Sequence, residues 1–229
     1  MNKINLINND AFNELINIED NSIDLILTDP PYNISKYTTE NVYIGERRLN
    51  TKIAEWDYIE FNPQKLVKIF KRILKPNGNI FIFTSYNMLG MWHNFFDKEF
   101  DTFQFMVWHK TNPVPCIYKK TFVNSCELII CLWNKGHKWN FQSQEEMHNF
   151  IETPICSYPE RLIAPKHPTQ KPISVLKHII NIASNKGDVV LDPFMGVGST
   201  GVAAIEVSRN FIGIEIDNTY FQAAKSRLL

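Results

Sequence analysis

Two features of the sequence predict an α/β fold with a parallel, doubly wound sheet. Short apolar runs alternate with stretches of helical periodicity, and the alternation is cleanest in the last third of the chain. The chain has 229 residues, of which 44% are hydrophobic, and this is enough to bury one sizeable core. We therefore expect residues 1–229 to form one domain that carries loop insertions.

The first half of the chain begins with the expected strands "INLI" and "SIDLILTD", with a helical stretch between them. In that stretch Phe12, Leu15 and Ile16 share one face. A longer helix is predicted from Asn62, and "KPNG" is expected to end it. The strand "NIFIFTS", a helix over 88–96 and the strands "FQFMVWH" and "CELIICLW" follow.

The last third of the chain shows the pattern most clearly. It predicts a helix over 173–183, the strand "DVVLD", a helix over 199–207, the strand "FIGIEI" and a closing helix from Asn218. Strands that alternate with helices in this way are expected to run parallel, because each helix returns the chain to the same edge of the sheet.

The remaining stretches lack a period and are expected to be insertions on this scaffold. Residues 33–57 are polar, contain Gly45, and predict a long mobile loop next to the strand "SIDLILTD". The segment "KTNPVPCIYKKTFVN" and residues 134–165 are punctuated by prolines and are expected to lie outside the core.

Composition narrows the class of protein. Lysine and arginine together number 24, as do aspartate and glutamate, so the formal net charge is zero. Any contact with nucleic acid must therefore come from local basic residues. The four cysteines show no zinc-ligand spacing, which favours reduced thiols and no metal site. The N-terminus lacks the apolar core of a signal peptide, and no apolar stretch is long enough to span a bilayer. We expect a cytoplasmic protein with no membrane partner.

A glycine turn late in the chain predicts a ligand site. In "VVLDPFMGVGSTGVAAIE", Asp192 ends a strand and Gly196 and Gly198 form the turn before the next helix. Ser199 or Thr200 is the expected N-cap of that helix. Such a turn lets a ligand approach the backbone at the helix start, although it could also be a tight turn without any ligand.

Glu215 makes a nucleoside the favoured ligand. It ends the strand that follows the glycine turn, where its carboxylate can accept hydrogen bonds from ribose hydroxyls. The third glycine of the dinucleotide fingerprint is missing from its usual place, so pyrophosphate is disfavoured. A cofactor with a ribose but no phosphates fits best.

The stretch "ILTDPPYNI", residues 26–34, predicts catalytic chemistry at the end of a buried strand. Asp29 can accept one N–H of an exocyclic amine on a nucleobase, and a backbone carbonyl fixed by Pro30 and Pro31 can accept the other. The ring of Tyr32 offers a face on which a base extruded from a duplex can stack. The alternative is a simple turn, since Asp-Pro and Pro-Pro are common in turns.

Four motifs in order carry a resemblance to a known family. "TDPPYNI", "HPTQKP", "LDPFMGVGST" and "FIGIEID" together resemble the amino-group DNA methyltransferases that use S-adenosylmethionine, found in restriction–modification systems. The catalytic motif precedes the cofactor motif, as in the β class of that family. The resemblance covers nearly the whole chain and implies a Rossmann-like methyltransferase sheet, with a target recognition region at about residues 110–165.

The resemblance also implies a role for each motif residue. Asp29, Pro30, Pro31 and Tyr32 would form the catalytic pocket. The residues implied at the cofactor are Asp10, Asp29, His167, Thr169, Gln170, Lys171, Asp192, Pro193, Phe194, Gly196, Gly198, Ser199, Thr200 and Glu215. Two alternatives stay open, because Asp10 could be a helix N-cap and "HPTQKP" could be a helix entry capped by Thr169 or Gln170.

The expected activity also follows from the resemblance. In the family, aspartate in D-P-P-Y goes mostly with adenine N6 and serine with cytosine N4. We therefore expect site-specific adenine-N6 methylation of DNA by direct transfer, with cytosine N4 as the alternative. The catalytic turn has no Pro-Cys motif, which agrees with the absence of a covalent enzyme intermediate. Methylation of RNA or protein amides usually goes with N-P-P-Y, and an inactive DNA-binding subunit would not need intact motifs.

Contacts to double-stranded DNA are expected from local basic and aromatic residues in the irregular segments. The candidates are Arg47, Arg48, Lys110, Tyr118, Lys119 and Lys120. Solvated loop charge is the alternative at each of these positions. By analogy with the family, a homodimer, a cognate restriction endonuclease or a companion methyltransferase could be further partners.

Overall fold

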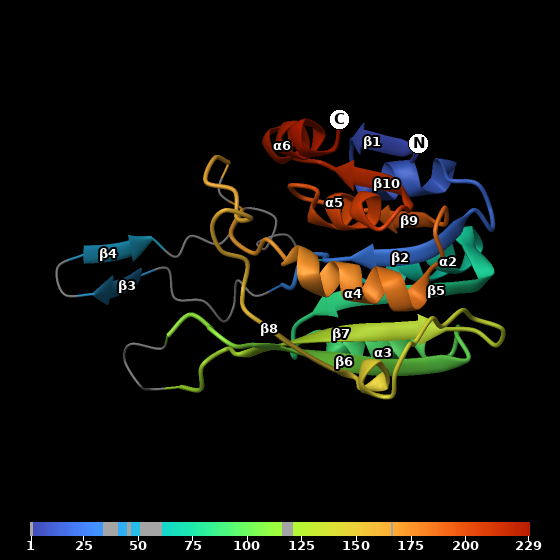
Figure 1. The fold of residues 1–229 in the computed structure, drawn as a ribbon, viewed down its shortest axis with the longest axis horizontal. Coiled ribbons are helices and arrows are strands. Elements are labelled where there is room, and N and C mark those ends of the chain that lie inside the picture. The colour runs from blue at the N-terminus through green and yellow to red at the C-terminus, as the bar shows by residue number, and fades with distance from the viewer. Residues whose placement is uncertain (1, 34–40, 45–46, 51–60, 116–120, 166) are drawn as a thin grey trace.

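An eight-stranded mixed sheet runs through the molecule, with helices on both faces (Figure 1). The computed structural model describes residues 2–33, 41–44, 47–50, 61–115, 121–165 and 167–229, with only the backbone given for 41–44 and 47–50. In spatial order the strands are β1 (Ile4–Asn8), β10 (Asn210–Glu215), β9 (Val189–Asp192), β2 (Ile23–Thr28), β5 (Leu74–Thr84), β7 (Cys126–Trp133), β6 (Thr102–Lys110) and β8 (Phe150–Thr153).

Strand β7 departs from the parallel sheet that the sequence predicts. It pairs antiparallel with both β5 and β6, whereas the other neighbouring strands of this sheet are parallel. The physical reason is the connection: no helix of the described residues separates β6 from β7, so the chain turns back directly along its neighbour. The sheet is doubly wound but mixed.

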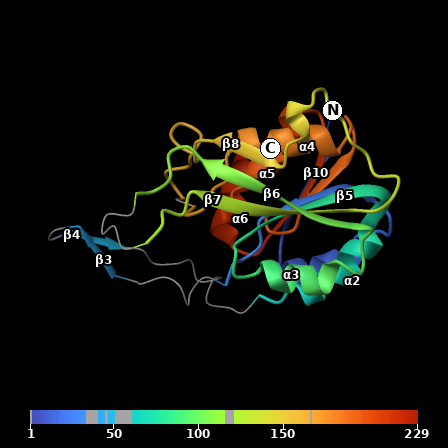
Figure 2. The same cartoon turned by 90° about the horizontal axis from the view of Figure 1, so that it is seen from below.

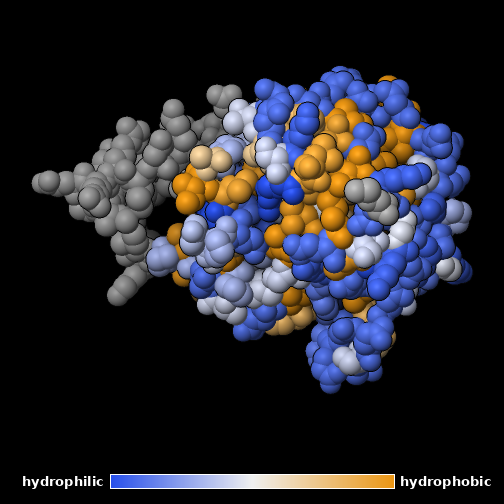
Figure 3. Space-filling model, turned by 45° about the horizontal axis from the view of Figure 1, so that its top comes forward, coloured by the Kyte–Doolittle hydropathy of each residue, from blue (hydrophilic) through white to orange (hydrophobic). Residues whose placement is uncertain are grey.

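The helices form two layers, and each layer has its own apolar core. α1 (Ala11–Glu14), α2 (Gln64–Ile73) and α3 (Leu89–Phe96) cover one face of the sheet. α4 (Ile173–Ala183), α5 (Ser199–Glu206) and α6 (Asn218–Leu228) cover the other, as the edge-on view shows (Figure 2). On the surface, hydrophobic residues gather in the middle of one face and hydrophilic residues surround them (Figure 3).

The chain reverses its direction of winding between β2 and β9, which are neighbours in the sheet. From β2 the chain crosses through α2 to β5 on one side, and from β9 it crosses through α5 to β10 on the other. The connections therefore diverge at the carboxyl ends of β2 and β9. Open α/β sheets bind their ligands in the crevice formed at such a switch point.

Three expectations about the irregular segments are wrong in part. A hairpin of β3 (Asn41–Ile44) and β4 (Arg47–Asn50) lies within the expected loop 33–57. The sequence does not indicate this hairpin, because its strands are too short to show a period. "KPNG" does not separate a helix from a strand, since it belongs to β5, and the pairing register with β2 shifts there. β8 lies within residues 134–165, where no strand was predicted.

The first helical stretch also differs from the prediction. α1 ends at Glu14 and a short 3₁₀ turn, Leu15–Asn17, follows it. Leu15 is fully buried, but Ile16 is 64% exposed, because the tighter turn rotates it away from the face that Leu15 occupies. The predicted face of three apolar residues is therefore incomplete.

Candidate active site

A pocket of ≈ 390 Å³ lies at the switch point between β2 and β9. Its lining brings together residues from both ends of the chain. Of the residues that the sequence placed in the catalytic and cofactor sites, those that line it are Asp10, Asp29, Pro30, Pro31, Tyr32, His167, Thr169, Gln170, Lys171, Asp192, Pro193, Phe194, Gly196, Ser199, Thr200 and Glu215. Gly198 is not among the lining residues, and Lys65 and Tyr220 line the pocket without having been predicted.

Asp192 connects the two halves of the site. Its carboxylate accepts hydrogen bonds from the hydroxyls of Thr28 at 2.8 Å and Thr200 at 2.7 Å, and from the backbone N–H of Phe194 at 3.1 Å. Burial raises the pKa of Asp192 to about 7, although these donors act in the opposite direction. Thr28 precedes Asp29, so this carboxylate fixes the candidate catalytic turn, residues 29–32, against the glycine turn that contains Gly196 and Gly198.

The glycine turn has the backbone that its sequence predicts, but a different residue caps the helix. Gly196 has φ +52°, and a Cβ there would lie 2.9 Å from Nε2 of His167. Gly198 has φ +79° and is itself the N-cap of α5. Ser199 and Thr200, the expected caps, lie inside the helix, because the left-handed turn ends one residue earlier than the sequence suggests.

Glu215 and Asp10 each accept hydrogen bonds from backbone N–H groups and also line the pocket. The carboxylate of Glu215 accepts the backbone N–H groups of Gly196 at 2.9 Å and Asp217 at 2.7 Å, and burial raises its pKa. Asp10 is the N-cap of α1, where its Oδ1 accepts the N–H of Phe12 at 2.7 Å. It also lines the pocket, so both interpretations of this residue are compatible with the structure.

Glu160, and neither Thr169 nor Gln170, caps the helix that follows "HPTQKP". Its Oε1 accepts the N–H of Ile173, the first residue of α4, at 2.7 Å. Gln170 instead bridges the segment before it, accepting the N–H of Leu162 and donating to the carbonyl of Glu160, both at 3.0 Å. A cap supplied from thirteen residues away leaves no local sequence signal.

His167 forms one wall of the pocket. Its ring packs edge-on against Tyr220 of α6, with 4.8 Å between ring centroids. Burial, followed by the charges of Lys171 and Arg161, lowers the pKa of His167 to about 4. The imidazole is therefore neutral at physiological pH, and it faces the backbone of Gly196.

The candidate catalytic turn, residues 29–32, holds a network of charges that the sequence only partly indicated. The ammonium of Lys171 lies 2.5 Å from Oδ2 of Asp29 and 3.3 Å from Oε2 of Glu127, and the hydroxyl of Tyr32 donates to Oδ1 of Asp29. Burial is the main factor that raises the pKa of Asp29, and the charge of Glu127 adds to it, while Lys171 opposes both. Lys171 was expected at the cofactor, and Glu127 was not predicted at all.

The structure locates only some of the candidate DNA contacts. Lys110 forms an ion pair with Glu127 at 2.8 Å, and its side chain is 12% exposed. The side chains of Arg47 and Arg48 lie outside the described residues, as do Tyr118, Lys119 and Lys120. Their contact with DNA stays a prediction.

Within the described residues, no cluster of histidine, cysteine, aspartate and glutamate could hold a metal ion, and Cys126, Cys131 and Cys156 are free thiols. Among the helices of the described part, none is long and apolar enough to cross a membrane.

The sheet, with its switch-point pocket and its antiparallel β7, defines the class as a Rossmann-like domain with a ligand pocket beside an acidic turn at Asp29. A comparison with protein families identifies the family. The DNA methylase family model matches residues 23–226, and the chain belongs to this family.

Individual relatives agree with this assignment. The Type II methyltransferase M2.DpnII of Streptococcus pneumoniae is 33% identical over 246 residues, which cover 99% of this chain and 90% of that protein. M2.LlaDCHI of Lactococcus lactis subsp. cremoris, also a Type II methyltransferase, is 32% identical over 242 residues, covering 97% and 88%. The chain is thus similar along its whole length to methyltransferases of restriction–modification type.

Solved structures support the same fold. The crystal structure of an M1.HpyAVI–SAM complex has a TM-score of 0.73 and 29% identity, and the match covers 98% of both chains. The match to the cytosine-N4-specific PvuII DNA methyltransferase has a TM-score of 0.74 and covers 99% of this chain and 86% of the PvuII chain. The two chains are 17% identical, so this match shows the fold alone. The chain is an enzyme, a DNA methyltransferase of the amino-group class.

Proposed function

We propose that this chain transfers a methyl group from S-adenosylmethionine to N6 of an adenine that is flipped out of double-stranded DNA. One observation carries the proposal: the catalytic turn and the glycine turn end neighbouring strands and open into the same pocket. The hydrogen bond from Thr28 to Asp192 joins them across 164 positions of the sequence. A donor and an acceptor of a methyl group can therefore meet there.

The pocket fits S-adenosylmethionine in its chemistry. Gly196 lines the pocket and carries no side chain, so a ligand can approach its backbone, and His167 packs so closely on it that a Cβ there would lie 2.9 Å from Nε2 of the ring. The carboxylates of Asp192 and Glu215 suit a cationic ligand that carries ribose hydroxyls. When bound, the cofactor supplies an electrophilic methyl group.

Asp29 is the residue that we assign to the target amine. It lines the pocket and its side chain is 20% exposed, so one oxygen can accept an N–H from an amine that enters. An accepted hydrogen bond localises the nitrogen lone pair and makes the amine a better nucleophile. The raised pKa of Asp29 also suits a group that takes up the proton lost by the methylated amine.

The choice of adenine rests on the first residue of the D-P-P-Y motif. The fold does not distinguish the two bases, since the cytosine-specific PvuII enzyme shares it. The test is to incubate the chain with labelled S-adenosylmethionine and genomic DNA and then digest the DNA to nucleosides. We expect label in N6-methyldeoxyadenosine. Label in N4-methyldeoxycytidine alone would overturn the base assignment.

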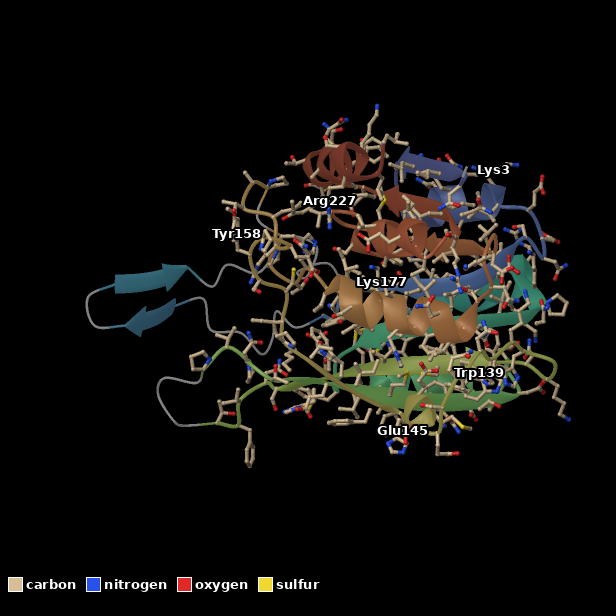
Figure 4. The ribbon with its side chains drawn as sticks, viewed as in Figure 1. Lys3, Trp139, Glu145, Tyr158, Lys177 and Arg227 are labelled. Carbon is tan, nitrogen blue, oxygen red and sulfur yellow. The ribbon has the colours of Figure 1, made fainter. Side chains whose placement is uncertain are left out.

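Residues 110–165 are proposed as the target recognition region. Tyr158 lies in this stretch, is 79% exposed and points away from the body of the domain (Figure 4), and Phe122 is 98% exposed. Exposed aromatic rings at a DNA interface can contact bases. Methylation-sensitive sequencing of DNA from expressing cells, with and without Tyr158→Ala, tests this. An altered site preference or weaker DNA binding is expected, and identical site patterns and rates would contradict it.

A companion methyltransferase, a cognate endonuclease and a homodimer are proposed as partners because relatives of this chain are Type II methyltransferases. Light scattering of the purified chain at several concentrations tests the dimer. A mass of one chain, 26.7 kDa, at every concentration would exclude the dimer.

A further inference from the structure

Four charged side chains from four parts of the chain meet beside the catalytic turn. Asp29 follows β2, Lys110 ends β6, Glu127 lies on β7, and Lys171 precedes α4. Their side chains are between 6% and 20% exposed, so each charge is largely removed from water. The two ammonium groups balance the two carboxylates, which makes the cluster neutral.

Glu127 is at the centre of this cluster. Its Oε1 lies 2.8 Å from the ammonium of Lys110, and its Oε2 lies 3.3 Å from the ammonium of Lys171. The hydroxyl of Tyr32 is 3.4 Å from the same Oε2. Burial acts to raise the pKa of Glu127, but the two lysines more than offset it and the pKa lies below its ordinary value. Glu127 is therefore a stable anion.

Lys171 is shared between two carboxylates. Its ammonium contacts Asp29 at 2.5 Å and Glu127 at 3.3 Å, and it lies 5.3 Å and 5.1 Å from the ring centroids of Tyr32 and Phe83. Aromatic walls keep water away from it, so its position is set by its two anionic partners. If one partner were neutral, the lysine would pair with the other alone.

We propose that Glu127 is a positioning residue of the active site, which keeps Lys171 and Tyr32 from binding Asp29 exclusively and so leaves Asp29 able to accept the amine of the target base. This role rests on the proposed function, in which Asp29 contacts the amine. Glu127 itself lines no part of the pocket and acts through its neighbours.

The charges predict how the pH dependence changes without Glu127. The titratable groups that face it among the described residues are Lys110 from β6, Lys171 from before α4, and Asp29 and Tyr32 from after β2. The negative charge of Glu127 raises the pKa of Asp29. Removing that charge lowers the pKa of Asp29, so the acid limb of kcat, which needs the ionised carboxylate, moves to lower pH.

The experiment compares Glu127→Gln, Glu127→Asp and the control Glu99→Gln in the full chain. Glu99 forms an ion pair with Lys71 of α2, its side chain is 40% exposed, and it lies outside both the pocket and residues 110–165. For Glu127→Gln we expect kcat to fall about 10- to 100-fold, with the acid limb at lower pH and S-adenosylmethionine binding within about threefold of the wild type. Glu127→Asp should recover part of kcat, and Glu99→Gln should match the wild type.

A second variant tests the same idea in the opposite direction, and it also serves if Glu127→Gln fails to fold. Lys110→Met removes the other partner of Glu127, so Lys171 should move towards Glu127 and the acid limb should shift to higher pH. Unchanged kcat and pH profile in Glu127→Gln would overturn the proposal, and so would a loss that Glu127→Asp does not restore and that leaves the acid limb in place. Where Lys110→Met alone can be measured, an acid limb that stays in place would overturn it. If the wild-type chain methylates no DNA, the proposed function fails instead.

Discussion

At the scale of single residues, Asp29 has the most direct part in the proposed reaction. Asp29→Asn keeps the shape of the side chain but removes the negative charge of the carboxylate, which accepts a hydrogen bond from the amine in the proposed reaction. We expect kcat to fall at least about 100-fold while S-adenosylmethionine binds within about threefold of the wild type. Methyl transfer from labelled cofactor and calorimetric binding measure the two quantities.

A matched control for that substitution is Asp97→Asn at the end of α3, outside the pocket. It should leave both quantities unchanged. If Asp29→Asn methylates DNA at the wild-type rate, the assignment of the amine to Asp29 is wrong.

Gly196 and Gly90 offer a paired test of the glycine turn. At Gly196 the backbone is left-handed and a Cβ would lie 2.9 Å from His167, whereas at Gly90 in α3 a Cβ would contact nothing within 4 Å. Gly196→Ala should lower the free energy of unfolding by about 1–2 kcal/mol and weaken cofactor binding. Gly90→Ala should raise the free energy of unfolding by about 0.5–1 kcal/mol, since alanine favours a helix. Chemical denaturation measures both, and an equal effect of the two substitutions would contradict this account.

At the scale of elements, the cap of α4 controls the segment that lines the pocket. Glu160→Ala removes the acceptor of the Ile173 N–H, whereas Glu160→Gln retains a side-chain oxygen there. We expect the alanine variant to lose about 1 kcal/mol of unfolding free energy and to bind S-adenosylmethionine more weakly, because residues 167–171 lead into this helix. The glutamine variant should lose much less. A wild-type KM for the cofactor in Glu160→Ala would show that the cap does not position the segment.

Most helices and strands could be predicted because their apolar periodicity is local. The α4 range 173–183 and the strands around Asp29 and Asp192 agree with their predicted bounds to within a residue. The direction of β7 could not be predicted, because it depends on the path of the preceding segment. β8 has only four residues, of which only Ile151 is buried, and this is too short for a period.

The same limit explains what was missed in the site. The motifs around Asp29, Gly196 and Glu215 are contiguous, and a single stretch of sequence shows each of them. Glu127 follows Cys126 at the start of a strand, where a glutamate usually faces solvent, and only the pairing of β6 with β7 brings it to Lys110 and Lys171. A partner contributed by another strand leaves no local signal.

At the scale of the whole molecule, the doubly wound sheet gathers three carboxylates at one pocket, of which Asp192 is buried and Asp29 and Glu215 are partly buried. Burial raises the pKa of Asp29, Asp192 and Glu215, and for Asp192 to about 7. A buried acid with a raised pKa contributes stability that is fully present below its unfolded pKa and is lost as the pH rises through the folded pKa. For Asp192 the window runs from 3.8 to about 7, so the unliganded protein should become less stable across it.

Binding of a cationic cofactor should have the opposite dependence on pH. A sulfonium gains more from an ionised carboxylate than from a neutral one, so affinity for S-adenosylmethionine should increase between about pH 6 and pH 8 as Asp192 loses its proton. We expect the rise in Tm caused by saturating cofactor to be larger at pH 8 than at pH 6. In Asp192→Asn, which keeps an oxygen for Thr28 and Phe194, both the fall in apo stability and the growth of the cofactor effect should be reduced. A cofactor-induced rise in Tm that does not change with pH in the wild type would show that the carboxylate of Asp192 does not take part in binding.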